Sequence, residues 1–203
     1  MSKELSTRLS PTADLSVVTP ATRASVWLRP AGIVLAGSIF AAVCAHVSLP
    51  LYFTPVPLSL APFAVLVLGL LLSPRLAAAT FGAYLVEGAL GLPVFAPTPA
   101  ISGLAHLIGP TGGYLLAYPL AAALIAFLVR RTGRGFTSAL LAAAAGDLLI
   151  LASGALWLCV LTRVSAHSVF TLAVLPFLPG DALKVAAAAA LAAGWVRLRR
   201  RDA

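Results

Sequence analysis

The stretch GLPVFAPTPAISGLAHLIGPTGGY, residues 91–114, decides how the rest of this chain is interpreted. It interrupts a long apolar sequence with prolines and glycines, which break helices. Non-helical backbone can lie at membrane depth only where it is buried in protein or lines a cavity, because hydrocarbon offers its N–H and C=O groups no partner. We therefore expect this stretch to be a structured loop that forms the wall of a ligand site.

The composition predicts an integral membrane protein. Of the 203 residues, 61% are hydrophobic and only 10% are charged, which is far from the composition of a soluble domain. A net charge of +8 would suggest nucleic acid if the basic residues formed one face, but they occur in small clusters at the edges of apolar runs. We therefore expect contact with membrane lipid and no nucleic-acid partner. The cysteines, Cys44 and Cys159, lie in apolar segments without the spacing of a metal site.

The apolar segments predict an all-α fold, a polytopic bundle of six transmembrane helices over residues 31–203. A polar tail, residues 1–30, precedes the bundle and is expected to be cytoplasmic. The second and third segments are shorter than the about 20 residues that a spanning helix needs, so we expect the adjoining loops to dip inward. The six segments are Ala31–Leu49, Leu58–Leu72, Leu76–Leu90, Gly112–Val129, Phe136–Leu161 and Ala182–Leu198.

The basic residues predict the orientation, because cytoplasmic loops collect Lys and Arg near the ends of spans. If six spans alternate, twelve of the fourteen Lys and Arg residues fall on one side, and Arg163 alone lies in a loop on the other side. Both termini should then be cytoplasmic. The same alternation places most of the prolines in outer loops, which suits a site that opens outward.

Small residues recur at four-residue spacing in the first segment, at Gly37, Ala41 and Ala45. Such residues let helices approach closely in lipid. The pattern fits packing inside the bundle as well as it fits a face that docks a partner subunit.

Ionisable residues within apolar segments suggest function, because they are costly to bury in a membrane. Glu87 could simply reach headgroup water, and Asp147 could be either a structural acceptor or a ligand contact. Asp181 and Lys184 are three residues apart and so share one helix face, where they could neutralise each other or bind a ligand.

Other polar residues near the outer boundary carry weaker signals. Ser59 could cap the next helix or reach a ligand. The histidines His46, His106 and His167 have no carboxylate or cysteine at ligand spacing, so we interpret them as polar loop residues and expect no metal. Enzyme signatures and a phosphate-binding GxxxxGK[ST] loop are absent from the sequence, which predicts a protein without an ATP site or other cofactor of its own.

The chain resembles the BioY family, the biotin-binding S components of energy-coupling factor (ECF) transporters. The motifs that carry the resemblance are PVPLSL at 55–60, YLVEGALGLPVFA at 84–96, GPTGGY at 109–114, GDLLILASGALWL at 146–158 and PFLPGDALK at 176–184. At Asp147 this chain departs from the family, which usually has Asn at that position.

The resemblance implies a transport function and not an enzyme. It implies a high-affinity biotin site near the outer face of a bacterial plasma membrane. It also implies that the first span docks on a transmembrane coupling subunit driven by two ATPase subunits, so that ATP is used only by partners. The docking face would then be Gly37, Ala41 and Ala45.

On this interpretation, specific residues are expected to contact biotin. Tyr84, Tyr114 and Trp157 would line the pocket, with Ser59 and Asp147 as further contacts. Lys184 would bind the ligand carboxylate, and Asp181 would accept N–H groups from the ligand or from Lys184.

Three other interpretations remain open at this stage. The chain could be an S component for another small vitamin. It could be an intramembrane enzyme that uses Glu87, Asp147 and Asp181 as acids and bases. It could also be a membrane scaffold without a ligand.

Overall fold

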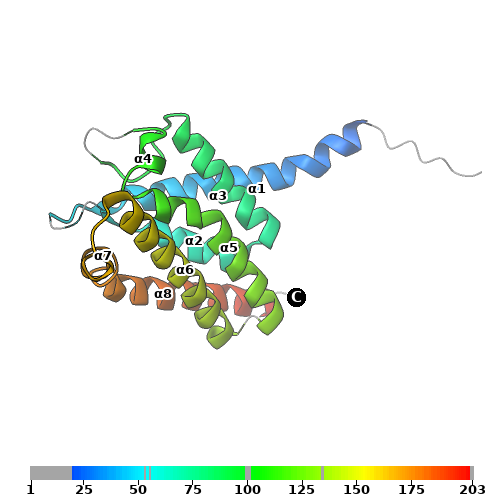
Figure 1. Ribbon diagram of the computed structural model, residues 1–203. Coiled ribbons are helices and arrows are strands. Elements are labelled where there is room, and N and C mark those ends of the chain that lie inside the picture. The colour runs from blue at the N-terminus through cyan, green and yellow to red at the C-terminus, as the bar shows by residue number, and fades with distance from the viewer. Residues whose placement is uncertain (1–19, 53, 55, 99–101, 134, 202–203) are drawn as a thin grey trace, which may run out of the picture.

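The structure is a computed structural model that describes residues 20–52, 54, 56–98, 102–133 and 135–201. Apart from two short strands, the elements are helices (Figure 1). In chain order they are α1 (Pro20–His46), β1 (Ser48–Leu49), β2 (Leu58–Ser59), α2 (Ala61–Leu71), α3 (Pro74–Ala89), α4 (Ala105–Ile108), α5 (Gly112–Thr132), α6 (Phe136–Thr162), α7 (Ala166–Ala173) and α8 (Leu178–Arg201).

The helices α1, α2, α3, α5, α6 and α8 lie where the apolar segments predict them. The first begins earlier than predicted, at Pro20, so part of the predicted polar tail is helical. A helix satisfies its own backbone hydrogen bonds and can therefore continue from an apolar segment into water. Figure 1 shows this N-terminal part of α1 projecting beyond the other helices. Residues 1–19 of the predicted tail lie outside the described residues.

Helix lengths fit a multi-pass membrane protein but do not confirm six complete spans. Residues Leu28–His46 of α1, together with α5 and α6, are each long and apolar enough to cross a membrane. The helices α7 and α8 would add a fourth span if they act as one segment bent by 54°. In contrast, α2 has only 11 residues, roughly 16 Å at 1.5 Å per residue, against a hydrocarbon core of about 30 Å.

Helix α2 occupies the centre of the bundle. It contacts α1, α3, α5, α6 and α8, and most of its side chains are buried. Neighbouring helices carry large apolar side chains on their outer faces, such as Leu141, Leu148 and Leu156 of α6. Lipid would cover these faces, since the bundle leaves them exposed.

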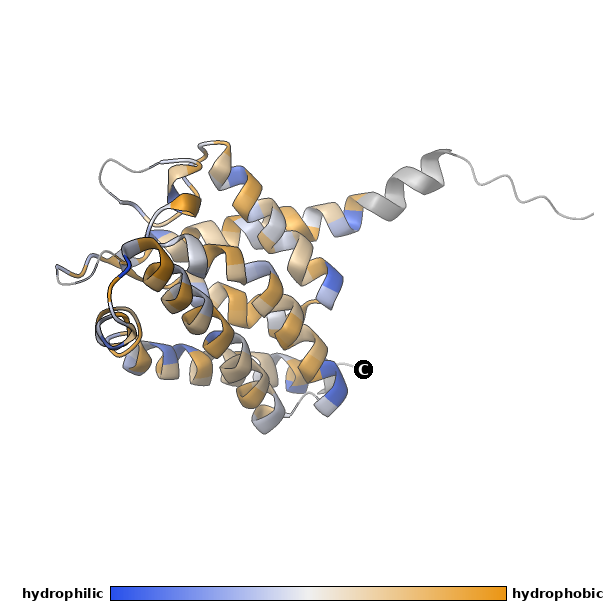
Figure 2. Ribbon diagram, viewed as in Figure 1, coloured by the Kyte–Doolittle hydropathy of each residue, from blue (hydrophilic) through white to orange (hydrophobic). Residues whose placement is uncertain are grey.

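The basic helix ends lie on one side of the molecule. Arg75 is in the first turn of α3, and Arg130 and Arg131 are in the last turn of α5. Figure 2 shows these hydrophilic ends on the same side as the C-terminus, opposite the loop that holds α4. The structured loops and the basic loops are therefore separated, as the sequence predicts.

The loop between α1 and α2 contains a feature that an all-α prediction misses. Strands β1 and β2 pair antiparallel, with Ser48 opposite Ser59, and the Leu60 N–H donates to the Val47 carbonyl at 2.9 Å. Ser59 therefore does not cap α2, whose N-cap position is Leu60. The helix starts without a side-chain cap because Pro62, in its first turn, has no N–H to satisfy.

Helices α5 and α6 approach each other closely because glycines stand at their contacts. A Cβ at Gly154 would overlap the ring of Tyr114, and one at Gly113 would overlap Trp157. These two contacts fix the start of α5, and with it the end of the 91–114 loop, against α6.

The small residues of α1 face inward. Ala41 and Ala45 are 1% and 0% exposed, and a Cβ at Gly37 would meet the Thr80 side chain of α3 at 2.6 Å. In this structure the three small residues therefore pack inside the bundle. This is the first of the two interpretations of Gly37, Ala41 and Ala45, and partner docking is the second. A coupling subunit could reach them only if α1 moved away from α3.

This packing predicts different effects for two tryptophans on α1. Ala41→Trp should destabilise the purified chain by about 1–3 kcal/mol, because it over-packs a buried helix contact. Val43→Trp is the matched control, since Val43 is 61% exposed on the same helix and should tolerate the change. Thermal unfolding in detergent measures both. Equal midpoints for Ala41→Trp and the parent would instead place Ala41 on a free face.

Candidate functional site

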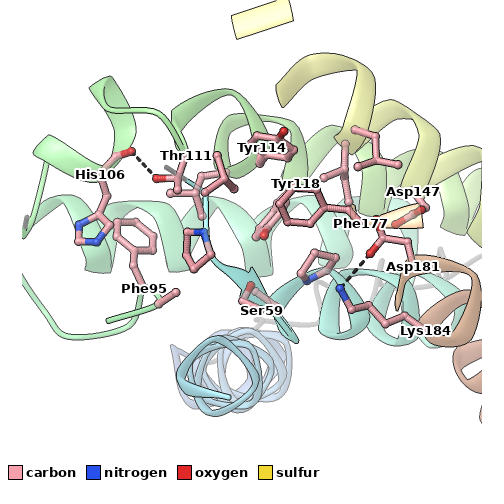
Figure 3. A pocket seen from close by; sticks show the side chains of 18 of the residues that line it. Ser59, Phe95, His106, Thr111, Tyr114, Tyr118, Asp147, Phe177, Asp181 and Lys184 are labelled. Atoms are coloured by element: carbon pink, nitrogen blue, oxygen red, sulfur yellow. Dashed lines mark hydrogen bonds and ion pairs between the residues drawn. The ribbon is translucent and has the colours of Figure 1, made fainter. Parts of the chain in front are cut away.

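A cavity lies between the 91–114 loop, the strand β2 region and the helices α2, α3, α5, α6 and α8 (Figure 3). The loop forms one of its walls, as predicted from its prolines and glycines. The lining residues are Val56, Pro57, Ser59, Ala61, Pro62, Tyr84, Phe95, Ala96, Thr98, His106, Thr111, Tyr114, Leu115, Tyr118, Asp147, Ile150, Leu151, Phe177, Asp181 and Lys184.

One end of the cavity carries an acidic and basic cluster. The Lys184 ammonium donates to Asp181 Oδ1 at 2.9 Å, and the two residues are 8% and 4% exposed. Asp147 reaches the same end from α6 and is 6% exposed (Figure 3). It forms no ion pair among the described residues. The cluster thus holds two carboxyl groups and one ammonium, and the ammonium is paired with only one of the two carboxyl groups.

Aromatic rings form much of the remaining wall. The hydroxyl of Tyr84 donates to the Val94 carbonyl at 3.0 Å, and that of Tyr114 donates to the Ala173 carbonyl at 2.7 Å. Both hydroxyl protons are thereby used on backbone carbonyls, one in the 91–114 loop and the other at the end of α7. These tyrosines can therefore offer a ligand their ring faces and hydroxyl oxygens but not a free proton.

Three further aromatic residues, Phe95, Tyr118 and Phe177, complete this wall, and none of them was predicted as a site residue. Tyr118 stacks against Tyr84 with ring centroids 6.4 Å apart, and Phe177 lies 6.3 Å from the ring of Tyr114. The position of Tyr118 four residues after Tyr114 places both on one helix face, which was a usable signal. Phe177 had no such signal, because its position depends on the bend between α7 and α8.

Trp157, predicted as a lining residue, is not among the residues that line the cavity. Its Nε1 donates to the Gly109 carbonyl at 2.9 Å. One turn earlier on α6, the Ser153 hydroxyl donates to the Gly113 carbonyl at 2.8 Å. Trp157 therefore positions the end of the 91–114 loop from behind the cavity wall.

Glu87 also lies away from the cavity lining. Its carboxylate accepts a hydrogen bond from the Ser38 hydroxyl of α1, so it links α3 to α1. An enzyme that used Glu87 with Asp147 and Asp181 would need these three groups at one site. The structure places only Asp147 and Asp181 in the cavity.

Of the three histidines, only His106 lines this cavity. His46 makes a hydrogen bond through Nδ1 to the Ala42 carbonyl at 2.8 Å, and His167 is exposed on α7. His106 is 7% exposed and packs on Phe95, with ring centroids 5.3 Å apart. No local sequence pattern distinguishes it from the other two histidines.

Three comparisons with known proteins agree with this arrangement. The sequence model of the BioY family matches residues 15–201. The probable biotin transporter BioY of Pyrococcus horikoshii is 42% identical over 138 residues, which are 68% of this chain and 79% of that protein. The biotin transporter BioY of Thermotoga maritima is 32% identical over 160 residues, 79% of this chain and 89% of that protein.

A solved structure has the same fold. The crystal structure of the S-component for biotin from an ECF-type ABC transporter superposes with a TM-score of 0.73 at 25% identity, and the match covers 91% of this chain and 95% of that one. The family match, which extends over almost the whole chain, agrees with the cavity and with the motifs that line it. The chain therefore belongs to the BioY family, a family of transport proteins and not of enzymes.

Proposed function

We propose that this chain is the membrane-embedded subunit that captures biotin for uptake at the outer face of a bacterial plasma membrane. The observation that carries the proposal is the cavity, which combines aromatic walls with a buried cluster of Asp147, Asp181 and Lys184 in a chain of the BioY family. Biotin offers an apolar thioether ring, a ureido group and a valerate carboxylate. A cavity with apolar walls and a few placed polar groups suits such a ligand.

We assign the ureido group to the cluster of Asp147, Asp181 and Lys184. A ureido group has two N–H donors and one carbonyl acceptor, which can pair with carboxylate oxygens and an ammonium. A ligand carboxylate at the same end would find Lys184 already paired with Asp181, with the carboxyl group of Asp147 beside them. The lack of an unpaired cation at this end argues against the sequence-based assignment of Lys184 to the ligand carboxylate.

Delivery into the cell would require partners. We propose that a transmembrane coupling subunit and two ATPase subunits supply the energy, and that this chain binds no cofactor of its own. The basic ends of α3 and α5 would face the cytoplasm, and the cavity would then lie near the outer face.

The first test is binding by the purified chain without ATP. A capture subunit should bind one biotin per chain, saturably, and release it chemically unchanged. Equilibrium binding of radiolabelled biotin, with recovery of the ligand, measures this. Turnover of biotin, or an absence of saturable binding, would contradict the proposal.

The second test concerns Lys184. Lys184→Met should weaken binding of biotin and of biotinamide by a similar factor, about tenfold or more, because a hydrogen bond from a charged donor to the shared ureido group is lost. The matched control is the double variant Asp181→Asn with Lys184→Met, which also removes the Asp181 charge that Lys184→Met leaves without its partner, and which should fold more stably than Lys184→Met. If Lys184→Met weakened the binding of biotin but not of biotinamide, the ligand carboxylate would be assigned to Lys184 instead.

The third test concerns orientation. Reporter fusions at the N-terminus and at the C-terminus should both report a cytoplasmic location, because the basic residues gather on that side. An external signal from either fusion would show that the span count or the orientation is wrong.

A further inference from the structure

Among the described residues, His106 is the one whose side-chain polar atoms are fully enclosed and also lack a hydrogen-bond partner. Both Nδ1 and Nε2 are enclosed and unpaired. Buried polar atoms are nearly always hydrogen-bonded, because leaving them unpaired costs free energy. An imidazole held in this way is a group whose partner arrives with a ligand.

The position of His106 indicates where that partner would lie. His106 lines the inner cavity and also an outer groove, and Phe95, Ala96 and Thr98 do the same. It therefore stands where the cavity opens towards the outer loops. Figure 3 shows it at the opposite end of the cavity from Asp181 and Lys184.

The other hydroxyl groups at this end cannot replace His106 as donors in the arrangement observed. Thr111 donates to the carbonyl of His106 at 3.1 Å, and Thr98 donates to the Ala96 carbonyl at 3.3 Å. The imidazole carries at least one ring N–H in either protonation state, and that proton is not used by the described residues.

The charged groups that line the cavity indicate which end of the ligand lies beside His106. At the far end Lys184, the one cation that lines the cavity among the described residues, is already paired with Asp181, so an anionic group would find no unpaired cation there. A carboxylate is also costlier to bury than a neutral ureido group, which favours its placement at the mouth.

We propose that His106 binds the carboxylate end of the ligand at the mouth of the cavity, while the ureido end lies with Asp147, Asp181 and Lys184. This inference rests on the proposed biotin-binding function and adds to it a residue that fixes the direction of the ligand. His106 would then make the cavity bind ligands with a carboxylate more tightly than neutral analogues.

The test compares biotin with biotinamide, in which a neutral amide replaces the carboxylate. His106→Leu should raise the dissociation constant for biotin about tenfold to a hundredfold, because a hydrogen bond to a charged acceptor is lost, and should change that for biotinamide much less. His106→Gln keeps an N–H donor and should retain more of the biotin affinity. His167→Leu, on exposed α7, is the matched control and should bind both ligands as the parent does.

Thermal unfolding of the ligand-free variants separates a ligand contact from a structural role. His106→Leu removes unpaired polar atoms, so its ligand-free midpoint should equal or exceed that of the parent, while the midpoint shift caused by biotin should shrink. Equal losses of affinity for the two ligands, or unchanged affinity for both, would overturn the role of His106 while leaving the proposed function intact. If the parent chain itself binds no biotin, the proposed function fails and this inference fails with it.

Discussion

The structure depends on one constraint, that irregular backbone at membrane depth must find its hydrogen-bond partners within the protein. The outer loops meet this constraint with side chains from the helices around them. Tyr84 donates to Val94, Tyr114 to Ala173 and Trp157 to Gly109. The Gly109 carbonyl also accepts from the Gly112 N–H, whereas the carbonyls of Val94 and of Ala173, the last residue of α7, receive these bonds from tyrosines that also line the cavity. The same side chains therefore hold the outer segments in place and shape the cavity.

The same constraint explains how the cavity can be both polar and enclosed. Asp181 and Lys184 lie in the first two turns of α8 and neutralise each other directly. Asp147, from α6, has no such cation of its own among the described residues. The cavity keeps one end rich in acceptors and the other end lined by aromatic rings and an unpaired imidazole.

The sequence was sufficient where the signal is local. Long apolar runs located the major helices, and the spacing of Asp181 and Lys184 located the ion pair. Helix α7 was missed because polar residues such as His167, Ser168 and Thr171 interrupt its apolar pattern. The β1 and β2 pairing, the inward face of Ala41 and the bond from Trp157 to Gly109 join residues from different elements. Such contacts depend on tertiary packing: no local pattern predicts the strand pairing or the Trp157 bond, and the pattern at Ala41 fits packing and docking equally well.

The shortness of α2 has a consequence for transport distance. Ala61 and Pro62 line the cavity at the start of this helix, and the basic residue Arg75 follows shortly after its end. A ligand in the cavity is thus separated from the basic side of the molecule by 11 helical residues, roughly 16 Å. Since the hydrocarbon core is about 30 Å thick, capture would already carry the ligand through nearly half of the permeability barrier. If the chain takes up its ligand as proposed, the step that follows capture would have only the remaining half to cover.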